Sequence, residues 1–594
     1  MLGVLGTTAK AVRKLNFRRK SRRFIRRPLY TPEELQAQRQ QHFPVEPLFS
    51  IIVPLYNTPG DFLEEMLQSV LAQTYGKWEL CLADGSDNGT QVEDICRRYA
   101  REDDRIHYRR LPQNLGISGN TNACLSMAAG DYICLFDHDD LLHPAALFSF
   151  AKAIHQTGAD FLYTDELIFT RTPAHPKFIH FKPDYSPENL LSNNYICHFS
   201  AFRKSLLDRV GPLRSQYDGS QDHEFYLRAT AAAQKVVHIP QVLYYWRSHA
   251  NSVARDLDCK AYAFHSGRQA VTDFLAEQGL SVQVESTPIS PVIYRIHYPL
   301  AAPPPVSVLI PGNNNYALLS RCVESILENN TYPNSEILIV DNGSSQKKLL
   351  DYYEQLQTRH PNVRVLSCPW QTFSQAYALG AGEAKGELLL LLNPALMATQ
   401  PGWIEEMVML GQKEQTGCVG ARICFPNQTI AHAGLLILPG EPPVRAFYRQ
   451  SAADTGYMGR LHFAQQYSAV SGACMLVKKD LWMELGSRLP DDGWDVCFCL
   501  RLEKAGYRVL WTPWAKLTVK KARHIYPRPP SPVPRQWCSF PYDPCYNPNF
   551  CGHGVGFVPK ARPFRDFPPA LAANTEDKGI TNKNQYNHYS EKRN

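Results

Sequence analysis

Polar residues follow two predicted buried strands in the first half of the chain, at positions where a ligand could bind. The first strand leads into VPLYN, which places Pro54, Tyr56 and Asn57 at its exit, and the second ends at Asp84. In open parallel sheets, ligands bind outside the carboxyl ends of the strands. We therefore expect these side chains, although distant in sequence, to line one pocket.

A third polar group is the acidic run DHDD, residues 137–140, which directly follows the apolar strand YICLF. Asp137 and Asp139 have one residue between them, so in an extended exit they share a side. Two such carboxylates suit a hard cation, which would bridge a diphosphate. The alternative is a set of solvated acids that cap the next helix, since Asp140 precedes an apolar segment. The repeated strand–helix pattern around this run favours the cation site.

Two later clusters supply candidates for acid–base chemistry and metal ligation. The stretch GSQDHEFYLR offers Asp222 as a general base, with Glu224 to steady its surroundings. The alternative is an exposed helix start, because acids favour the first helical turn. Farther on, LYYWRSHANSVA offers His249 as a metal ligand or phosphate contact. A lone histidine is more often structural, so spacing alone gives little support to the ligand role.

The elements that must position these residues alternate between strands and helices. Apolar runs bounded by turn residues predict strands, and apolar residues at helical spacing predict helices. We expect strands at 49–53, 78–83, 106–109 and 132–136, and helices at 61–72, 90–101 and 121–129. Pro54 is expected to end the first strand, and NLGISGN is interpreted as a turn. This order predicts an α/β fold with a mostly parallel sheet and helices on both faces.

The same order of landmarks occurs twice along the chain. The first copy contains SIIVP, ADGS and YICLFDHDD; the second contains SVLIP, VDNGS and LLLLLNPAL. In the second copy Asn393 and Ala395 stand where the first has Asp137 and Asp139. Alanine cannot coordinate a hard cation. A duplicated fold with acids in only one copy predicts one working site and one scaffold.

Composition divides the chain into four segments. Residues 1–45 form a basic arm with a short helix near 32–41, and residues 46–300 hold the first copy. Three consecutive prolines, residues 303–305, mark a stiff boundary. Residues 305–525 hold the second copy, and residues 526–594 form a Pro-rich extension. The polar end of that extension, from about Ala573, is expected to be disordered.

The basic charge is concentrated at the N-terminus. The run from Lys10 to Arg27 holds no acid. It is either a solvated, frayed terminus or a surface arm for anionic lipid headgroups. Nothing downstream resembles a nucleic-acid module, so no nucleic-acid partner is expected. No apolar run reaches the ~18 residues that indicate a membrane span. We therefore expect a cytoplasmic protein, peripheral at the cytoplasmic face of the inner membrane.

Taken in order, these motifs resemble those of bacterial family 2 glycosyltransferases with a GT-A fold. The resemblance extends from Phe49 to about Asn549 and is greatest to the tandem enzymes of O-antigen and cell-surface polysaccharide biosynthesis. It implies two tandem GT-A domains, each a Rossmann-like nucleotide-diphospho-sugar transferase fold. It also implies inverting transfer of a hexosyl or deoxyhexosyl group from a UDP- or dTDP-sugar to a hydroxyl of a glycan acceptor, which the basic arm suggests is lipid-linked.

The resemblance also assigns roles to the candidate residues. Pro54, Tyr56 and Asn57 would line the nucleotide pocket, and Asp84 would contact the base. Asp137 and Asp139 match the DxD motif that holds the ribose and the metal-bound diphosphate. Asp222 matches the catalytic base, although Gln221 stands where glutamate is common. The implied cofactor is Mn²⁺ or Mg²⁺, held by Asp139 and His249, with Glu224 and Asp140 in support.

The second copy departs from the family pattern. It keeps Asp341, and Asp495 matches Asp222, but Cys497 replaces Glu224 and Val519 falls where many relatives place a metal-binding histidine. A catalytically degenerate second domain is therefore predicted. Two alternatives stay open: a bifunctional enzyme with two transfer sites, and a non-catalytic glycan-binding or assembly scaffold. The segment DPCYNPNF, residues 543–550, matches one that often closes such tandem proteins, so we expect the Pro-rich tail to be partly ordered against the second domain.

Overall fold

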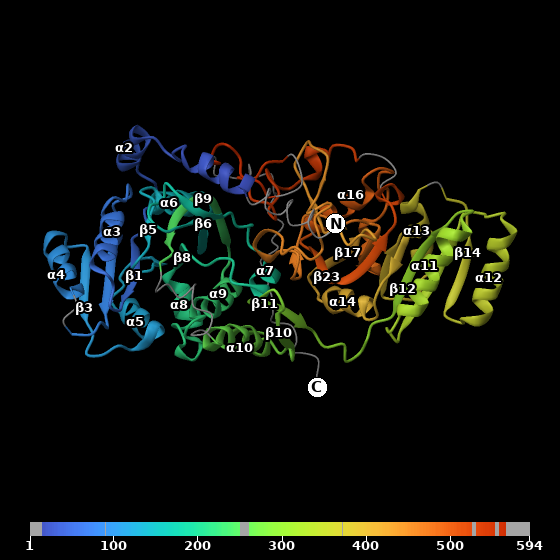
Figure 1. The fold of residues 1–594 in the computed structure, drawn as a ribbon, viewed down its shortest axis with the longest axis horizontal. Coiled ribbons are helices and arrows are strands. Elements are labelled where there is room, and N and C mark those ends of the chain that lie inside the picture. Colours follow the sequence, from blue (N-terminus) through green and yellow to red (C-terminus); the bar gives the residue numbers. More distant parts are fainter. Residues whose placement is uncertain are drawn as a thin grey trace. The chain divides into compact units, whose positions relative to one another are not determined.

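The computed structural model describes residues 15–88, 91–249, 261–370, 372–525, 530–552 and 557–565, and it divides into two compact units (Figure 1). Unit 1 comprises Met1–Tyr294, Asn547–Phe550 and Val558–Asn594, and unit 2 comprises Arg295–Tyr546 and Cys551–Phe557. The chain therefore returns to unit 1 after it has built most of unit 2. The polar end that is expected to be disordered, and the start of the basic arm, lie outside the described residues.

The main sheet of unit 1 has the strand order β3-β2-β1-β4-β8-β6-β9-β5, with β7 beside β6. Its strands are β1 (Phe49–Leu55), β2 (Trp78–Asp84), β3 (Ile106–Arg110), β4 (Tyr132–Leu135), β5 (Leu141–Leu142), β6 (Phe161–Phe169), β7 (Pro176–His180), β8 (Ser200–Arg203) and β9 (Val236–Arg247). Strands β1 to β4 pair in parallel. Because β8 runs antiparallel to both β4 and β6, the sheet is mixed, although β6 and β9 again pair in parallel.

The strands that carry the candidate site are buried along their whole length. Every residue of β1, β2 and β4 is buried, as expected of parallel strands covered on both faces. Pro54 lies inside β1, opposite Ala83, and does not end the strand. The pairing of β1 with β4 stops at Ile52, so the missing N–H of Pro54 breaks no hydrogen bond on that side.

Helices cover the sheet of unit 1 on both faces (Figure 1). They are α3 (Gly60–Leu71), α4 (Val92–Glu102), α5 (Gly116–Leu125), α6 (Ala146–Thr157), α7 (Pro187–Ser192), α8 (Lys204–Val210), α9 (Gln221–Ala232) and α10 (Ala261–Glu277). Helix α5 begins within the segment that was expected to be a turn. Its start is held by side chains, because Asn114 accepts from the N–H of Gly116 and Asn120 accepts from that of Leu115.

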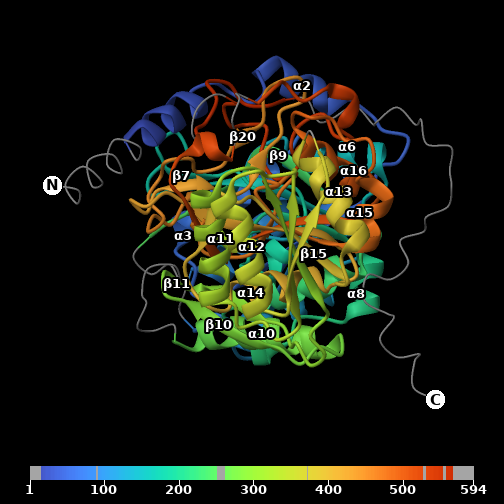
Figure 2. The same cartoon turned by 90° about the vertical axis from the view of Figure 1, so that its right-hand side faces the viewer.

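Unit 2 repeats the strand order of unit 1 as β14-β13-β12-β15-β22-β17-β23-β16. These strands are β12 (Val306–Gly312), β13 (Ser335–Asp341), β14 (Val363–Ser367), β15 (Leu388–Leu392), β16 (Leu396–Ala398), β17 (Thr416–Cys424), β22 (Cys474–Lys478) and β23 (Arg508–Val519). Figure 2 shows α11 (Tyr316–Asn329) beside α12 (Lys347–Arg359) in this unit. The predicted duplication of one α/β fold is confirmed.

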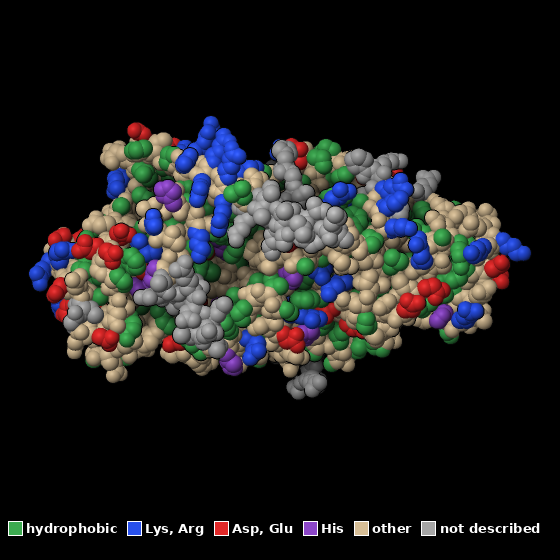
Figure 3. All heavy atoms as spheres, viewed as in Figure 1, with side chains coloured by type: hydrophobic (Ala, Val, Ile, Leu, Met, Phe, Trp, Pro, Cys, Tyr) green, Lys and Arg blue, Asp and Glu red, His purple; other side chains and the backbone are tan. Residues whose placement is uncertain are grey.

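The described part of the basic arm packs on unit 1. Residues 15–25 are helical, and α2 (Pro32–Gln40) follows. Phe17 stacks on Phe178 with ring centres 5.2 Å apart, and Phe24 meets Phe181 edge-on at 5.1 Å. Basic side chains gather over this region in Figure 3, and the exposed ones include Arg18, Arg19, Arg22 and Arg23. No helix in the part of the chain that the structure describes is long and apolar enough to cross a membrane.

The segment DPCYNPNF divides between the two units. Asp543 is buried in unit 2, where its carboxylate accepts from the N–H of Ile437 at 2.5 Å and from Ser468 Oγ at 2.6 Å. Asn547–Phe550 instead belongs to unit 1. The Pro-rich tail is therefore ordered in part against the second domain, as expected at Asp543, and in part within unit 1.

Candidate active site

Asp84 ends β2 with both carboxylate oxygens occupied. Oδ1 accepts from the N–H of Ser86 at 2.8 Å, and Oδ2 accepts from Tyr108 Oη at 2.7 Å and from Arg110 Nη1 at 2.8 Å. Burial raises the pKa of Asp84, but these hydrogen bonds outweigh it and hold the pKa below its ordinary value. Asp84 is therefore an ionised and rigidly held group at the sheet edge.

The loops after β1 and β2 are joined by reciprocal hydrogen bonds. Asn57 adopts a left-handed backbone (φ 49°), which asparagine tolerates better than most residues. Its N–H donates to Ser86 Oγ at 2.8 Å, and its side-chain amide exchanges hydrogen bonds of 2.7 and 2.9 Å with Asp87. Beside this clamp, the ring of Tyr56 is 44% exposed. Pro54 is buried behind them in β1. The residues expected on the nucleotide side therefore do meet.

Asp137 lies beyond the end of β4, with its carboxylate 3.4 Å from His198 Nε2. Its side chain is 44% accessible, and the rest of it is covered by protein atoms. Those surroundings raise the pKa of Asp137; His198 opposes the shift, and the charges of Asp139 and Asp222 add to it. Three of the predicted acids are therefore electrostatically coupled at one place.

Asp139 and His249 face each other, with Oδ2 and Nε2 2.7 Å apart. Both side chains are about one-fifth exposed, at 18% and 22%. An oxygen and a nitrogen donor suit Mn²⁺ and also Mg²⁺. No group of three His, Cys, Asp or Glu side chains within the described ranges is arranged to hold a metal ion. Two protein donors nevertheless fit a cation whose remaining ligands are phosphate oxygens and water, as is usual for Mg²⁺.

The carboxylate of Asp140 points into the protein, unlike those of Asp137 and Asp139. Its carboxylate accepts from the N–H of Arg247 at 2.6 Å and from Tyr244 Oη at 2.5 Å. Burial raises the pKa of Asp140 well above its ordinary value, and Asp139 and Asp137 add to the shift. Arg247 Nε also donates to the backbone carbonyl of Asp139 at 2.7 Å. Asp140 and Arg247 thus tie the acidic loop to β9.

Asp222 lies in the first turn of α9 and is partly exposed. Its Oδ2 accepts from Asn194 Nδ2 at 2.7 Å. Glu224, two residues on, is buried and receives two hydrogen bonds from Arg228, at 2.6 and 2.7 Å. Glu224 therefore anchors the helix, while Asp222 presents a carboxylate at its end.

Four residues at this site were missed by the sequence reasoning: Tyr108, Arg110, Asn194 and His198. Arg110 ends a strand of the parallel set, so the rule that ligands bind at strand ends could have found it. Asn194 and His198 lie in a loop, residues 193–199, that follows α7. Nothing in their local sequence marks them, since their partners Asp222 and Asp137 are brought to them by the fold.

Unit 2 keeps the equivalent of the nucleotide side. Asn314 is also left-handed (φ 39°), and its N–H donates to Ser344 Oγ at 2.9 Å. Asp341 accepts from the N–H of Ser344 at 2.7 Å and from Tyr353 Oη at 2.8 Å. The loops after the first two strands are therefore built alike in both units.

The acidic side differs in unit 2. Asn393 Oδ1 accepts from the N–H of Ala395 at 2.9 Å, and Ala395 is itself buried. Asp495 is 8% exposed, and its oxygens accept from the N–H groups of Gly472 and Val496, both at 2.9 Å. Val519 is fully buried and pairs with Leu396. None of these residues presents a carboxylate or an imidazole as the first unit does.

Comparisons with known proteins agree with this duplicated architecture. The model of the glycosyl transferase family 2 matches residues 50–211 and 307–484, together more than half of the chain. Protein y4gI of Sinorhizobium fredii is 36% identical over 86% of this chain and 58% of its own length. The O-antigen biosynthesis protein RfbC of Myxococcus xanthus is 30% identical over 85% of this chain and 40% of its own. The chain thus spans about half the length of these relatives.

Among solved structures, TarS of S. aureus in complex with UDP-GlcNAc is 19% identical, covers 38% of this chain and 71% of that chain, and has a TM-score of 0.33. The family model matches once within each compact unit. The chain therefore belongs to glycosyl transferase family 2, with one GT-A domain in each unit.

Proposed function

We propose that unit 1 transfers a sugar from a nucleoside-diphosphate donor to a hydroxyl of a glycan acceptor, with inversion at the anomeric carbon. The observation that supports this most directly is the coupling of Asp137, Asp139 and Asp222 at the carboxyl end of β4. Membership of family 2 supplies the reaction class. The relative named for O-antigen biosynthesis supports surface polysaccharide assembly as the setting.

On the donor side, one group of residues is proposed to contact the base and another to contact the ribose and the diphosphate. Asp84 would accept from the N3–H of a uracil or thymine base in exchange for one of its present donors, and Tyr56, which is exposed, would lie beside the base. Asp137 would hold the ribose, and Asp139 with His249 would hold Mn²⁺ or Mg²⁺. When bound, such a cation neutralises charge that develops on the departing diphosphate.

On the acceptor side, Asp222 takes the proton. Asn194 occupies Oδ2, which orients the carboxylate and leaves Oδ1 toward the acceptor. As the hydroxyl oxygen forms its bond to the anomeric carbon, the bond from that carbon to the diphosphate breaks on the opposite face. The hydroxyl proton moves to Asp222. The products are the glycoside and the nucleoside diphosphate.

Unit 2 is proposed to be a degenerate copy that shapes where and on what unit 1 acts. The burial of Asp495 and the replacements Asn393 and Ala395 support this proposal. The second candidate is a bifunctional enzyme, which the intact loop around Asp341 favours. The two candidates differ in the number of linkages made.

The exposed arginines of residues 15–25 are proposed to contact an anionic membrane surface that carries a lipid-linked acceptor. Each basic residue near such a surface contributes about 1 kcal/mol. Deleting the arm would also remove Phe24 from its packing, so we prefer Arg18→Gln, Arg19→Gln, Arg22→Gln and Arg23→Gln together. We expect less of the variant than of the wild type to sediment with anionic vesicles, and equal amounts of the two with neutral vesicles. If the variant and the wild type sediment equally with anionic vesicles, this contact is excluded.

A donor screen tests the proposed reaction. The purified chain is incubated with UDP- and dTDP-sugars and Mn²⁺, with and without glycan acceptors, and release of nucleoside diphosphate is measured. One donor class is expected to be turned over faster with acceptor present. Absence of release with every donor would instead favour a glycan-binding scaffold. Anomeric configuration of the product, determined by NMR, distinguishes inversion from retention.

A further inference from the structure

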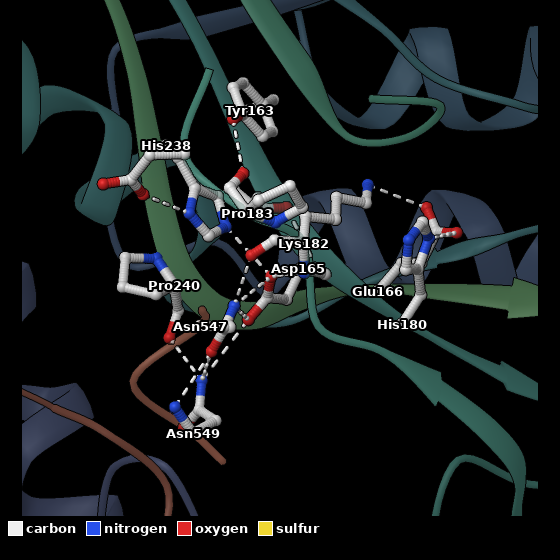
Figure 4. A network of polar contacts seen from close by, with 12 residues as sticks. Tyr163, Asp165, Glu166, His180, Lys182, Pro183, His238, Pro240, Asn547 and Asn549 are labelled. Atoms are coloured by element: carbon white, nitrogen blue, oxygen red, sulfur yellow. Dashed lines mark hydrogen bonds and ion pairs between the residues drawn. The ribbon is translucent and has the colours of Figure 1, made fainter. Parts of the chain in front are cut away.

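Two buried acids of β6 take no part in the proposed chemistry. Asp165 is fully buried and accepts from the N–H of Lys182 at 2.8 Å and from His238 Nε2 at 2.9 Å (Figure 4). Glu166 is 1% exposed and binds Lys182 Nζ at 2.9 Å and His180 Nδ1 at 3.1 Å. Charges buried this deeply are costly unless each is paired and hydrogen-bonded. Asp165 and Glu166 both meet this condition, so the question is what their partners hold in place.

The partners of Asp165 include residues from the far end of the chain. Asn547 Nδ2 lies 2.9 Å from each Asp165 oxygen and 2.8 Å from the carbonyl of Lys182. Asn549 Nδ2 donates to the carbonyl of Pro240 at 2.8 Å (Figure 4). Phe550 packs edge-on against Phe181 with ring centres 5.1 Å apart. The segment Asn547–Phe550 is thus an integral part of the core of unit 1.

Lys182 connects this core to the loop at the active site. Its Nζ is fully buried and donates to the carbonyl of Ile196 at 2.5 Å and also to that of His198. Lysine has three N–H donors, and Glu166 takes the third. The ammonium is therefore fully used, and two of its three hydrogen bonds hold the backbone of one short loop.

That loop, residues 193–199, carries two side chains that touch the proposed machinery. Asn194 binds Asp222 at 2.7 Å, and His198 lies 3.4 Å from Asp137. Backbone carbonyls of residues 196 and 198 are fixed by Lys182, and the carbonyl of Lys182 is fixed by Asn547. A continuous chain of contacts thus runs from Asn547 to both carboxylates.

We infer that Asn547 and Lys182 are positioning residues, which hold the 193–199 loop so that Asn194 and His198 orient Asp222 and Asp137 for transfer. This inference rests on the proposed function of unit 1. It makes catalysis by the first domain depend on a segment that follows the second domain in the sequence. Misplacement of a catalytic group by about 1 Å costs on the order of 100-fold in rate.

The first test replaces Asn547 in the full chain. We expect Asn547→Ala to lower kcat by about 10- to 100-fold with a change of less than about 3-fold in donor KM, because the Asp84 side is untouched. Backbone amides of residues 193–200 should exchange hydrogen faster, as measured by mass spectrometry. Arg562→Ala, at an exposed position of the same tail, is the matched control and should match wild type in both measurements. Wild-type kcat and exchange in Asn547→Ala would overturn the inference.

A second variant covers the case in which Asn547→Ala does not fold. Lys182→Met with Glu166→Gln removes both buried charges together, so neither is left unpaired. The folded double variant should show the same loss of kcat and the same faster exchange, and wild-type values in both would contradict the positioning role. If wild type releases no nucleotide from any donor, the proposed function fails; the exchange of residues 193–200 still decides whether Asn547 and Lys182 hold the loop.

Discussion

The two units share one strand order but differ in which side of the site they have kept. Both hold an asparagine in a left-handed turn, clamped to a serine, next to a hydrogen-bonded aspartate: Asn57 and Asp84 in unit 1, Asn314 and Asp341 in unit 2. Among the residues that the structure describes, only unit 1 presents carboxylates after its fourth strand and an imidazole, His249 after β9, that faces them. The nucleotide-side loops have persisted, and the acidic centre has not.

The physical chemistry of the two sides explains this difference. The contacts of Asp84 favour its ionised form. Asp84 therefore stabilises the fold in addition to any contact that it makes with a ligand. The surroundings of Asp137 disfavour its charge, so that carboxylate costs stability. An amide in its place, as at Asn393, removes this cost and binds a neighbouring N–H. Once its chemistry is not needed, an acidic centre is therefore lost more readily than a clamped loop.

The largest expected effect comes from giving unit 1 the residues of unit 2. Asp137→Asn with Asp139→Ala should abolish all transfer, because the ribose and diphosphate lose their contacts, while the thermal stability of the chain stays equal or rises. Product analysis by mass spectrometry with every accepted donor checks this. Survival of one linkage would show that unit 2 carries a second transfer site.

Removal of the proposed base should have the next largest effect. Asp222→Asn is expected to lower kcat by about 10²- to 10⁴-fold, the usual contribution of general base catalysis, without changing nucleotide affinity. Its matched control is Asp495→Asn in unit 2, which should leave kcat unchanged because Asp495 is buried on backbone amides. Equal turnover in Asp222→Asn and wild type would mean that another group accepts the proton.

A smaller effect is expected from the aspartates of the nucleotide side. Asp84→Asn should weaken nucleotide binding by about 10- to 150-fold, since a hydrogen bond to a charged group contributes about 1.5–3 kcal/mol. Asp341→Asn should leave the affinity and stoichiometry unchanged if unit 2 binds no nucleotide. Titration calorimetry with UDP measures both. A stoichiometry of two, reduced to one by Asp341→Asn, would reverse our assignment of unit 2.

The smallest expected effect is a dependence of stability on pH that belongs to unit 2. Burial raises the pKa of Asp543 to about 6, so the folded chain binds a proton there more tightly than the unfolded chain does. The stabilisation is full below pH 4 and is lost as pH rises through 6, by about 1–3 kcal/mol. Denaturant unfolding at pH 4 to 7 should show this slope in wild type but not in Asp543→Asn; identical slopes would exclude Asp543 as its source.

Much of this architecture follows from local sequence. The buried strands β1, β2 and β4 are short apolar runs, and the duplicated landmarks predicted the repeated fold. The antiparallel strand β8 was not predicted, because direction within a sheet depends on how distant elements connect. Helix α5 starts earlier than expected, because the side chains of Asn114 and Asn120 accept from backbone N–H groups at its start; the two glycines of NLGISGN had instead indicated a turn.

The site divides in the same way. The acids were predictable because carboxylates after an apolar strand form a local pattern. His198 and Asn194 could not be predicted, because their roles depend on residues that the fold brings near them. Asn547 and Asn549 are even more distant in sequence from the residues that they contact. The hydrogen bonds from Asn547 to Asp165 join residues 382 positions apart. No local pattern encodes such a contact.

The return of Asn547–Phe550 to unit 1 has a consequence for synthesis of the chain. Translation is directional, and domains generally fold as they emerge. When residues 46–300 leave the ribosome, Asp165 still lacks the Asn547 amide that completes its hydrogen bonds, and this amide is made only after most of unit 2. A product that stops before residue 547 therefore contains every proposed catalytic residue yet has an incomplete core. Synthesis of Asn547–Phe550 is therefore required before the core of the first domain can be completed.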